Sequence, residues 1–339
     1  MKDLQTSNAA LAAEIRDLAR VHPFNAGEAL PHGSITTANA SLFVQSHFSE
    51  PLTIYATGWR PGGNLDELCE FLAPTIPGTG ERYEHITYPN AEAFLSDANP
   101  DDDLRAPGSD FKTVDFTSDK ATRVVPNRGL RIVLDWDRIK TMPNWQEHYT
   151  NMLLRRIKLN AFRRKLALAI ASATDVPLVW DPAGAADPDY DLANHALLSG
   201  DASGVRPTSA FWGSTAELLR YATYGGTNTA KAMAGRLLTA VEASRKAGLS
   251  AIVDETRYQS GTSKTRALGA KVLLFTTALT STEDPSNFKT AKANTSQGGM
   301  VAVYVRQISV KLWEIVVEVY ESEFCASTLG VRTLSVTAS

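Results

Sequence analysis

The segment that decides the fold spans residues 142–173 and reads MPNWQEHYTNMLLRRIKLNAFRRKLALAIASA. Pro143 suits the first helical position, where its missing N–H costs nothing, and strong helix formers follow as far as Ala173. The pattern predicts one helix of roughly 30 residues, about 45 Å long. Its apolar residues form two stripes, so we expect the helix to pack on two sides. One stripe holds Leu153, Ile157, Ala161 and Leu168, and the other holds Met152, Leu159, Phe162, Leu166 and Ile170.

The same helix carries the densest basic cluster of the chain. Its charges point around most of the helix and alternate with both apolar stripes. This distribution favours salt bridges, together with side chains whose apolar stems pack on the protein while their charged ends reach solvent. A stripe that binds nucleic acid is the alternative interpretation. The cluster comprises Arg155, Arg156, Lys158, Arg163, Arg164 and Lys165.

The segments upstream of this helix alternate between apolar and polar residues. Residues 52–56 predict a strand, and residues 64–71 predict a helical turn or two. Alternating runs at residues 111–116 and 129–136 predict two further strands, with a charged linking segment, residues 117–125, between them. We expect these two runs to pair as a long hairpin. The second run places Leu130, Ile132, Leu134 and Trp136 on one face.

Downstream of Pro177, short helices alternate with short strands, and the closing section, residues 300–320, is almost entirely strand-like. The element order is therefore α+β, with one dominant helix. We predict helices at residues 189–198, 215–224 and 228–246, and strands at residues 250–253 and 271–279.

Composition limits the class of protein. A chain of 339 residues with 43% hydrophobic and 21% charged side chains is long enough for one large core or two moderate ones. No window is apolar enough to span a bilayer and no signal-peptide core occurs, so we expect folding in the cytosol. Cys69 and Cys325 lie far apart and outside any Cys-x-x-Cys pair, which predicts reduced thiols and no zinc site. The formal net charge of −3 gives the whole chain no attraction to nucleic acid.

Candidate metal motifs fail at positions that their chemistry requires. The segment at residues 187–191 begins like a calcium loop, but Leu192 stands where that loop needs glycine. We expect Asp187 or Asp189 to cap the following helix instead. The six histidines lack the spacing of a metal-binding helix, and they are His22, His32, His47, His85, His148 and His195.

Candidate catalytic motifs fail in the same way. The pair Gly225-Gly226 lacks the spacing of a P-loop, and no Gly-x-Ser-x-Gly elbow occurs. Residues 260–264 resemble a serine–lysine site only loosely, and we interpret them as a mobile loop. The sequence therefore predicts a protein that is not an enzyme and has no catalytic residue, cofactor or metal.

Several short sequence motifs, and the order in which they occur, resemble those of one known family. They include Pro51-Leu52-Thr53, Ala56-Thr57-Gly58, Asp103-Leu104-Arg105-Ala106-Pro107-Gly108, Asn127-Arg128-Gly129-Leu130, Asp189-Tyr190-Asp191-Leu192, Gly204-Val205-Arg206-Pro207, Phe211-Trp212-Gly213 and Asp284-Pro285-Ser286-Asn287. With the long helix, the charged hairpin before it and the terminal β-hairpin, they resemble the Hong Kong 97-like (HK97-like) fold. Tailed-bacteriophage major capsid proteins have this fold, and encapsulins and herpesvirus shell proteins share it.

The resemblance implies an α+β chain divided into the parts of that fold. The order is an N-terminal arm, an extended loop, a peripheral domain with a spine helix, and an axial domain. The parts correspond to an arm and adjoining strand at residues 1–60, the extended loop and its base at 80–135, the peripheral domain with its spine helix at 136–175, the axial domain at 176–295, peripheral-domain strands at 296–320 and a tail that returns to the axial domain at 321–339.

The resemblance also implies a function. We expect a structural protein that assembles with itself into hexamers and pentamers, and so into the icosahedral shell around phage double-stranded DNA. It would be assembled in the host cytoplasm and reside in the virion capsid. Its expected partners are a separate scaffolding protein, unless a prodomain has been removed, a portal and decoration proteins. Contact with the packaged DNA would be weak and non-specific, and no membrane is implied.

Alternating charges in the extended loop predict contacts between subunits, because a hairpin with so little apolar surface needs a partner. No asparagine partner for the loop lysines can be recognised, so we expect no covalent cross-link. An encapsulin-like compartment is the alternative function, and an enzyme with an unrecognised site in residues 176–295 is a further one. The predicted contact residues are Asp110, Lys112, Asp115, Asp119, Lys120 and Arg123.

Overall fold

The computed structural model describes residues 47–59, 64–76, 80–87, 104–105, 110, 119–181, 186–204, 206–225, 238–277 and 286–338. The described residues from Ser49 onward belong to one compact unit. The predicted strand at residues 111–116 lies outside the described residues. So do residues 228–237, the first part of a predicted helix. No described helix combines the length and the apolar character needed to cross a membrane.

The predicted long helix is confirmed as α6, Trp145–Ser172, with 28 residues. It begins after Asn144, so Pro143 precedes the helix instead of occupying its first turn. Residues of both predicted stripes pack within this chain, in two different core clusters. Leu153 and Ile157 of the first stripe are buried in one cluster, and Phe162 and Leu166 of the second stripe are buried in another. Met152 of the second stripe is 53% exposed. The buried apolar residues are Leu153, Leu154, Ile157, Ala161, Phe162, Leu166 and Ala169.

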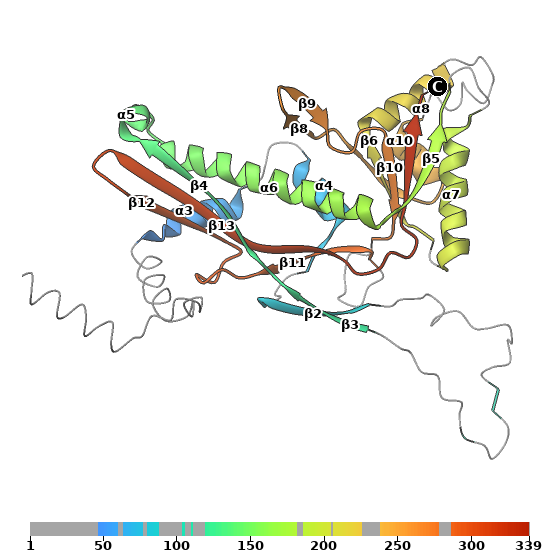
Figure 1. Cartoon of the computed structure of the whole chain (residues 1–339), viewed down its shortest axis with the longest axis horizontal. Helices are drawn as coiled ribbons and strands as arrows, with labels where there is room; N and C mark the ends of the chain where they lie inside the picture. The colour runs from blue at the N-terminus through green and yellow to red at the C-terminus, as the bar shows by residue number, and fades with distance from the viewer. Residues whose placement is uncertain are drawn as a thin grey trace, which may run out of the picture. The chain divides into compact units, whose positions relative to one another are not determined.

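Buried residues of α6 face a mixed sheet (Figure 1). In this sheet β1 (Thr75–Ile76), β11 (Phe288–Ala293), β13 (Leu312–Cys325) and β12 (Val301–Gln307) follow one another, and β4 (Asn127–Asp135) also pairs with β13. Along β13, Ile315, Val317 and Val319 are buried in one cluster with Leu154 and Ile157 of α6. Alternate residues of β13 therefore form the core under the helix.

Two short helices pack against α6, and one of them corrects a prediction. Residues 52–56, predicted as a strand, belong to α3 (Glu50–Gly58), whereas the short helix predicted at residues 64–71 is confirmed as α4 (Leu65–Leu72). In a helix Leu52 and Ala56 are four residues apart and share a face, and both are buried. Ile54 points the other way and is 66% exposed, so the apolar alternation is not a strand pattern.

The predicted hairpin upstream of α6 has different partners. Residues 119–124 of the expected linking segment form strand β3 (Asp119–Val124), which pairs with β2 (Arg82–Thr87). The predicted strand at residues 129–136 is confirmed as β4, but it pairs with β13 along its length, from Asn127 opposite Tyr320 to Asp135 opposite Leu312. Trp136 leaves the strand and begins α5 (Trp136–Ile139).

A second sheet has the strand order β5 (Thr174–Val179), β14 (Arg332–Thr337), β10 (Lys271–Phe275), β6 (Ser209–Gly213) and β7 (Ser250–Asp254). Helices α7 (Pro188–Ser203), α8 (Ser214–Gly225) and α10 (Ala240–Lys246) gather around it (Figure 1). Its core contains the fully buried Trp180 and Trp212, whose ring centroids lie 6.1 Å apart.

Most elements predicted after Pro177 are confirmed: the helices at residues 189–198 and 215–224, the strand at 250–253 and the β-hairpin at 300–320. The strand predicted at residues 271–279 ends earlier, at Phe275, because the next backbone N–H, that of Thr276, donates to the side chain of Asn287 at 2.6 Å. Residues 260–264, interpreted as a mobile loop, belong instead to a β-hairpin of β8 (Arg257–Ser260) and β9 (Ser263–Arg266), with its turn at residues 261–262. Gly261 supplies the positive φ of 61° that this turn needs.

Candidate assembly surfaces

Three of the six basic residues predicted on α6 form ion pairs or hydrogen bonds with neighbouring elements. Lys158 Nζ lies 2.8 Å from a carboxylate oxygen of Asp66 on α4. Arg164 contacts two carboxylates of β13, at 2.5 Å for Glu321 and 2.8 Å for Glu323. The favoured interpretation, salt bridges, is confirmed for Lys158 and Arg164.

Lys165 is the most deeply buried of the six, with 4% of its surface exposed. Its ammonium donates hydrogen bonds to the carbonyl oxygens of Cys69 and Ala73, at 3.2 and 3.1 Å. A helix leaves its last carbonyls without intrahelical partners, and its C-terminal end attracts cations. Lys165 therefore caps α4 from a neighbouring helix. Burial lowers the pKa of its ammonium.

The carboxylates that Arg164 contacts also connect β13 to β4. Arg128 of β4 lies 3.7 Å from a carboxylate oxygen of Glu323 and donates a 3.2 Å hydrogen bond to the backbone carbonyl of Glu321. Burial raises the pKa of Glu321, and the neighbouring Glu323 raises it further, whereas Arg164 opposes both effects. One pair of acidic residues thus joins a helix and two strands.

A second set of contacts joins the strands on the face of the sheet that is turned away from α6. Glu314 of β13 is 1% exposed, and it accepts hydrogen bonds from Arg131 of β4 and from Arg306 of β12. Four residues along, Glu318 accepts from Tyr304 of β12 at 2.7 Å and from Asn127 of β4 at 3.2 Å. Hydrogen bonds to charged groups are stronger than neutral ones, so these contacts across three strands stiffen the sheet.

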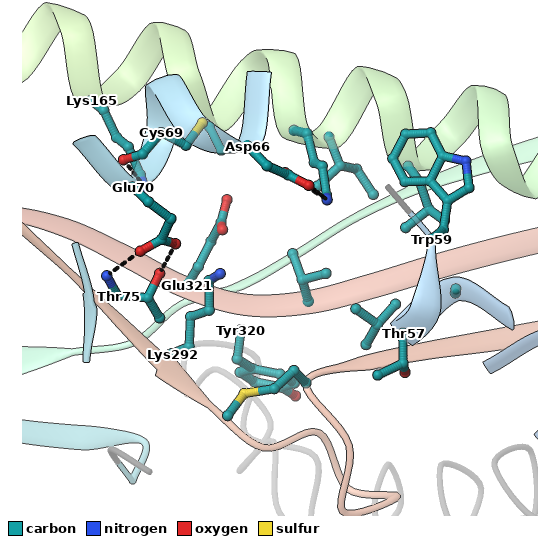
Figure 2. Close-up of a pocket in the computed structure, with 18 residues that line it drawn as sticks. Thr57, Trp59, Asp66, Cys69, Glu70, Thr75, Lys165, Lys292, Tyr320 and Glu321 are labelled. Atoms are coloured by element: carbon teal, nitrogen blue, oxygen red, sulfur yellow. Dashed lines mark hydrogen bonds and ion pairs between the residues drawn. The ribbon is translucent and has the colours of Figure 1, made fainter. Parts of the chain in front are cut away.

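A cavity of about 450 Å³ lies between α6, α4 and the sheet (Figure 2). One part of its wall is apolar, with Leu154, Ile157 and Val319, and another part is polar. In the polar part, Glu70 accepts from the backbone N–H of Thr75 at 2.9 Å and from its hydroxyl at 2.5 Å, which fastens α4 to β1. These polar groups hold elements together. Among the described residues, no group of three or more His, Cys, Asp or Glu side chains is placed to hold a metal.

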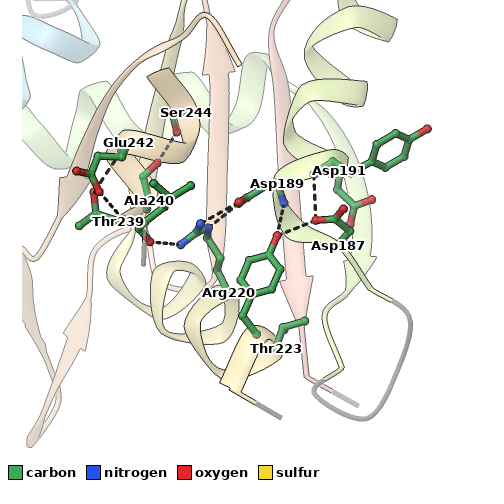
Figure 3. A network of polar contacts seen from close by, with 12 residues as sticks. Asp187, Asp189, Asp191, Arg220, Thr223, Thr239, Ala240, Glu242 and Ser244 are labelled. Atoms are coloured by element: carbon green, nitrogen blue, oxygen red, sulfur yellow. Dashed lines mark hydrogen bonds and ion pairs between the residues drawn. The ribbon is translucent and has the colours of Figure 1, made fainter. Parts of the chain in front are cut away.

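A second polar network joins α7 to α8 beside the second sheet (Figure 3). Asp187 caps α7 as predicted, by accepting from the backbone N–H of Tyr190. The hydroxyl of Tyr224 donates to Asp187 at 2.7 Å, and the backbone N–H of Asp189 donates to that hydroxyl at 3.2 Å. Burial and the hydrogen bond to Asp187 raise the pKa of Tyr224.

Arg220 lies in the same network, and only 2% of it is exposed. Its guanidinium donates two hydrogen bonds to Asp189, at 2.6 and 2.9 Å, and a third to the backbone carbonyl of Leu238 at 2.8 Å. Leu238 leads into α10, whose first turn is closed by a reciprocal cap between Thr239 and Glu242. One buried guanidinium thus holds α7, α8 and the start of α10 (Figure 3).

Large apolar side chains are exposed around the turn between β12 and β13, next to α5. The backbone N–H of Trp136 donates to the carbonyl of Lys311 at 2.7 Å, and Lys311 pairs with Asp137 at 3.0 Å, so α5 is fixed to the turn. We call these exposed apolar residues the tip patch, and they are Val133 at 46%, Trp136 at 41%, Ile308 at 47%, Val310 at 88% and Leu312 at 36% exposure.

A second exposed apolar surface lies on α7. Tyr190, Leu197 and Leu198 are separated by seven and eight residues, which places them on one side of the helix, and they are 63%, 53% and 40% exposed. We call them the α7 patch. The sequence analysis missed both patches. The tip patch had one signal in the sequence, since Ile308 and Val310 stand in a turn, where polar residues and glycine usually stand.

The structure describes only part of the predicted loop contact. Lys112 and Asp115 lie outside the described residues, as do the side chains of Asp119 and Lys120, whose backbones belong to β3. Asp110 and Arg123 are both exposed. The exposure of these two residues does not test the contact with a neighbouring subunit, which stays a prediction.

No family model matches the chain. No curated protein matches it either. A phage-related protein from Bordetella bronchiseptica RB50 is similar in structure, with a TM-score of 0.62 and 17% identity over 85% of this chain and 96% of that one. The chain has the Hong Kong 97-like fold. This fold confirms the α+β architecture expected from the sequence.

Other solved structures are similar to this Hong Kong 97-like chain at lower scores. The capsid protein of cyanophage P-SCSP1u has a TM-score of 0.48 and 11% identity, over 78% of this chain and 86% of that one. The SrpI encapsulin of Synechococcus elongatus PCC 7942 has a TM-score of 0.44 and 13% identity, over 94% of both chains.

Proposed function

We propose that the chain is the major capsid protein of a tailed bacteriophage. Copies of it form hexamers and pentamers, and these close into an icosahedral shell around double-stranded DNA. The shell is assembled in the host cytoplasm and becomes the virion capsid, with a scaffolding protein, a portal and decoration proteins as its partners. The subunit acts as a building block and not as an enzyme.

The tip patch is the observation that carries this proposal. Single exposed apolar residues are ordinary on protein surfaces, but several large ones around one turn mark a surface that another molecule covers. Val310 is 88% exposed in the turn between β12 and β13. Glu314 of β13 accepts a hydrogen bond from Arg306 of β12, and Glu321 of β13 pairs with Arg164 of α6, so contacts on both faces of the sheet hold this strand pair. A rigid element that presents an apolar end suits a contact between subunits.

The α7 patch supports the same proposal. It lies on the second sheet's helices, whereas the tip patch adjoins the first sheet, so one subunit presents two different apolar surfaces. Contacts between unlike surfaces close into rings when the rotation between subunits permits, as hexamers and pentamers require. Two such surfaces on one chain are therefore what shell assembly needs.

Substitution in the tip patch tests the proposal. We expect the double variant Ile308→Asp and Val310→Asp to fold normally, because both side chains are exposed, but to form no shells, because charge at a buried contact is costly. The matched control is Ile54→Asp, at a residue of α3 that is 66% exposed and outside both patches. Electron microscopy and size-exclusion chromatography report assembly, and circular dichroism reports folding.

Two results would count against the proposal. Wild-type protein that remains a monomer at every concentration and salt would contradict self-assembly. Shells formed equally well by the double variant would contradict the role of the tip patch. The contents of shells made in cells distinguish a capsid from the main alternative, an encapsulin-like compartment. Nuclease-protected DNA supports a capsid, and a packaged enzyme supports the compartment.

A further inference from the structure

We propose that the outward face of α6 contacts the phosphate backbone of double-stranded DNA. This outer basic face consists of Arg155, Arg156 and Arg163. The inference rests on the proposed function, since a shell around DNA must turn one face of its subunits toward that DNA. It goes further by assigning the face and the residues.

The charge balance of α6 is the first observation. The helix has six basic residues and a single carboxylate, Glu147, in its first turn. Lys158, Arg164 and Lys165 are engaged with neighbouring elements, as described above. Arg155, Arg156 and Arg163 are exposed, and none of them forms an ion pair with a residue that the structure describes. Half of the cluster therefore lies on the surface without a neutralising carboxylate.

The geometry of these arginines suits a duplex. Around the helix axis they lie within about 100° of one another, and Arg155 and Arg163 are about 12 Å apart along it. One DNA strand carries a phosphate about every 3.4 Å along the duplex axis, so this length corresponds to three or four phosphates. Three guanidinium groups on one side of a straight helix can reach successive phosphates without any change of the backbone.

One of the three arginines is also held in place. The guanidinium of Arg163 lies 4.2 Å from the ring centroid of Tyr258 on β8. Stacking on an aromatic ring covers one face of the guanidinium and leaves its N–H edge available for phosphate oxygens. The arginine therefore loses less side-chain freedom when it binds. The turn of the β8–β9 hairpin, residues 260–263, is polar and contains no carboxylate that would repel DNA.

The expected binding is electrostatic and depends on salt. Three phosphate contacts predict that the logarithm of the binding constant falls with the logarithm of salt with a slope of about −2.7. A fourfold rise in salt then weakens binding by about forty-fold. Contact by a single subunit is weak, and a shell multiplies it over many copies.

An acidic protein segment is the competing partner for this surface. Such a segment also needs apolar contacts for affinity, and the apolar residues of α6 are turned inward, where Leu154 and Ile157 line the cavity. Met152 is the one large apolar residue with more than half of its surface exposed on α6. A surface of arginines with one exposed methionine favours phosphates, which require no apolar pocket.

Binding of a fluorescent 30-base-pair duplex by unassembled protein tests the inference. The test variant is Arg155→Gln, Arg156→Gln and Arg163→Gln. The control is Arg138→Gln, Arg245→Gln and Lys246→Gln, which removes the same charge from exposed positions on α5 and α10. Fluorescence anisotropy across a salt series gives the slope, and electron microscopy of each variant gives assembly.

We expect the control to keep the wild-type slope and the test variant to lose most of it, while both assemble into shells. Closed wild-type shells should not bind added duplex, because the face is inside. Equal slopes for test and control variants would overturn the inference, as would binding of a polyglutamate peptide that depends on the three arginines while duplex binding does not. A wild-type protein that binds duplex but forms no shell would instead contradict the proposed function.

Discussion

The guanidinium of Arg220 on α8 and the carboxylate of Asp189 on α7 form two parallel hydrogen bonds, at 2.6 and 2.9 Å. Removal of one partner of a buried ion pair leaves an uncompensated charge. We expect Arg220→Met to lower the free energy of unfolding of the subunit by about 3 kcal/mol. Urea denaturation of unassembled protein measures this change.

Arg245→Met, at an exposed position of α10, is the matched control for that substitution. It should change stability by no more than about 0.5 kcal/mol. Equal stability of the two variants would mean that Arg220 does not hold α7 and α8 together.

The close approach of Gly213 to Gly269 predicts a second effect. A Cβ at position 213 would lie 2.1 Å from the carbonyl oxygen of Gly269, so Gly213→Ala must displace backbone at the end of β6. We expect a loss of about 1 to 3 kcal/mol of stability, as for other overpacked sites. Gly225→Ala is the control, because nothing lies within 4 Å of its Cβ. A melting temperature of Gly213→Ala equal to that of the control would contradict this packing.

The thiol of Cys69 should react slowly. Burial raises its pKa from 9.0 to about 11, so at pH 8 it has about 100-fold less thiolate than an ordinary thiol. In a Cys325→Ser background, reaction with a disulfide reagent should accelerate about tenfold per pH unit up to pH 10. Unfolding in urea should abolish the difference from free cysteine. Fast reaction of the folded protein at pH 8 would show that the thiol is not shielded.

The raised pKa of Cys69 also makes the stability of the subunit depend on pH. The folded pKa lies above the unfolded one, so the folded state holds the proton more tightly. The contribution of Cys69 to stability is therefore fully present below about pH 9 and declines as the pH rises toward 11.

Charge reversal tests the extended loop. Lys120→Glu with Arg123→Glu should leave the subunit folded, because Arg123 is exposed on β3, while impairing assembly. Wild-type assembly should also weaken in high salt, since exposed charge pairs contribute only about 0.2 to 1 kcal/mol each and are screened. Light scattering during assembly measures both effects. Normal assembly of the double variant at low and high salt would show that the loop is not held by charge.

Elements with local signals could be predicted from the sequence, and long-range pairings could not. The 28-residue helix α6 and the cap at Asp187 depend on neighbouring residues and were predicted. The pairing of Asn127 with Tyr320 joins residues that are 193 positions apart, and no local pattern specifies such a partner. Residues 52–56 are too short for periodicity alone to separate strand from helix.

The candidate site was predictable only in its charges. The sequence identified the six cations of α6, but which three turn inward depends on the positions of Asp66, Glu321 and the end of α4. The tip patch depends on where a hairpin ends beside α5, which is again a tertiary relationship.

The order of strands in the second sheet determines how early during synthesis the subunit can finish folding. Strand β14, residues 332–337, lies between β5 and β10 and is the only described neighbour of β5 in that sheet. β5 leaves the ribosome first, and at about 5 to 20 residues per second its neighbour follows roughly 8 to 30 seconds later. During this interval β5 has no partner for its backbone. Nascent chains therefore cannot present a finished second sheet to other copies, and synthesis itself delays assembly until residues 332–337 have been made.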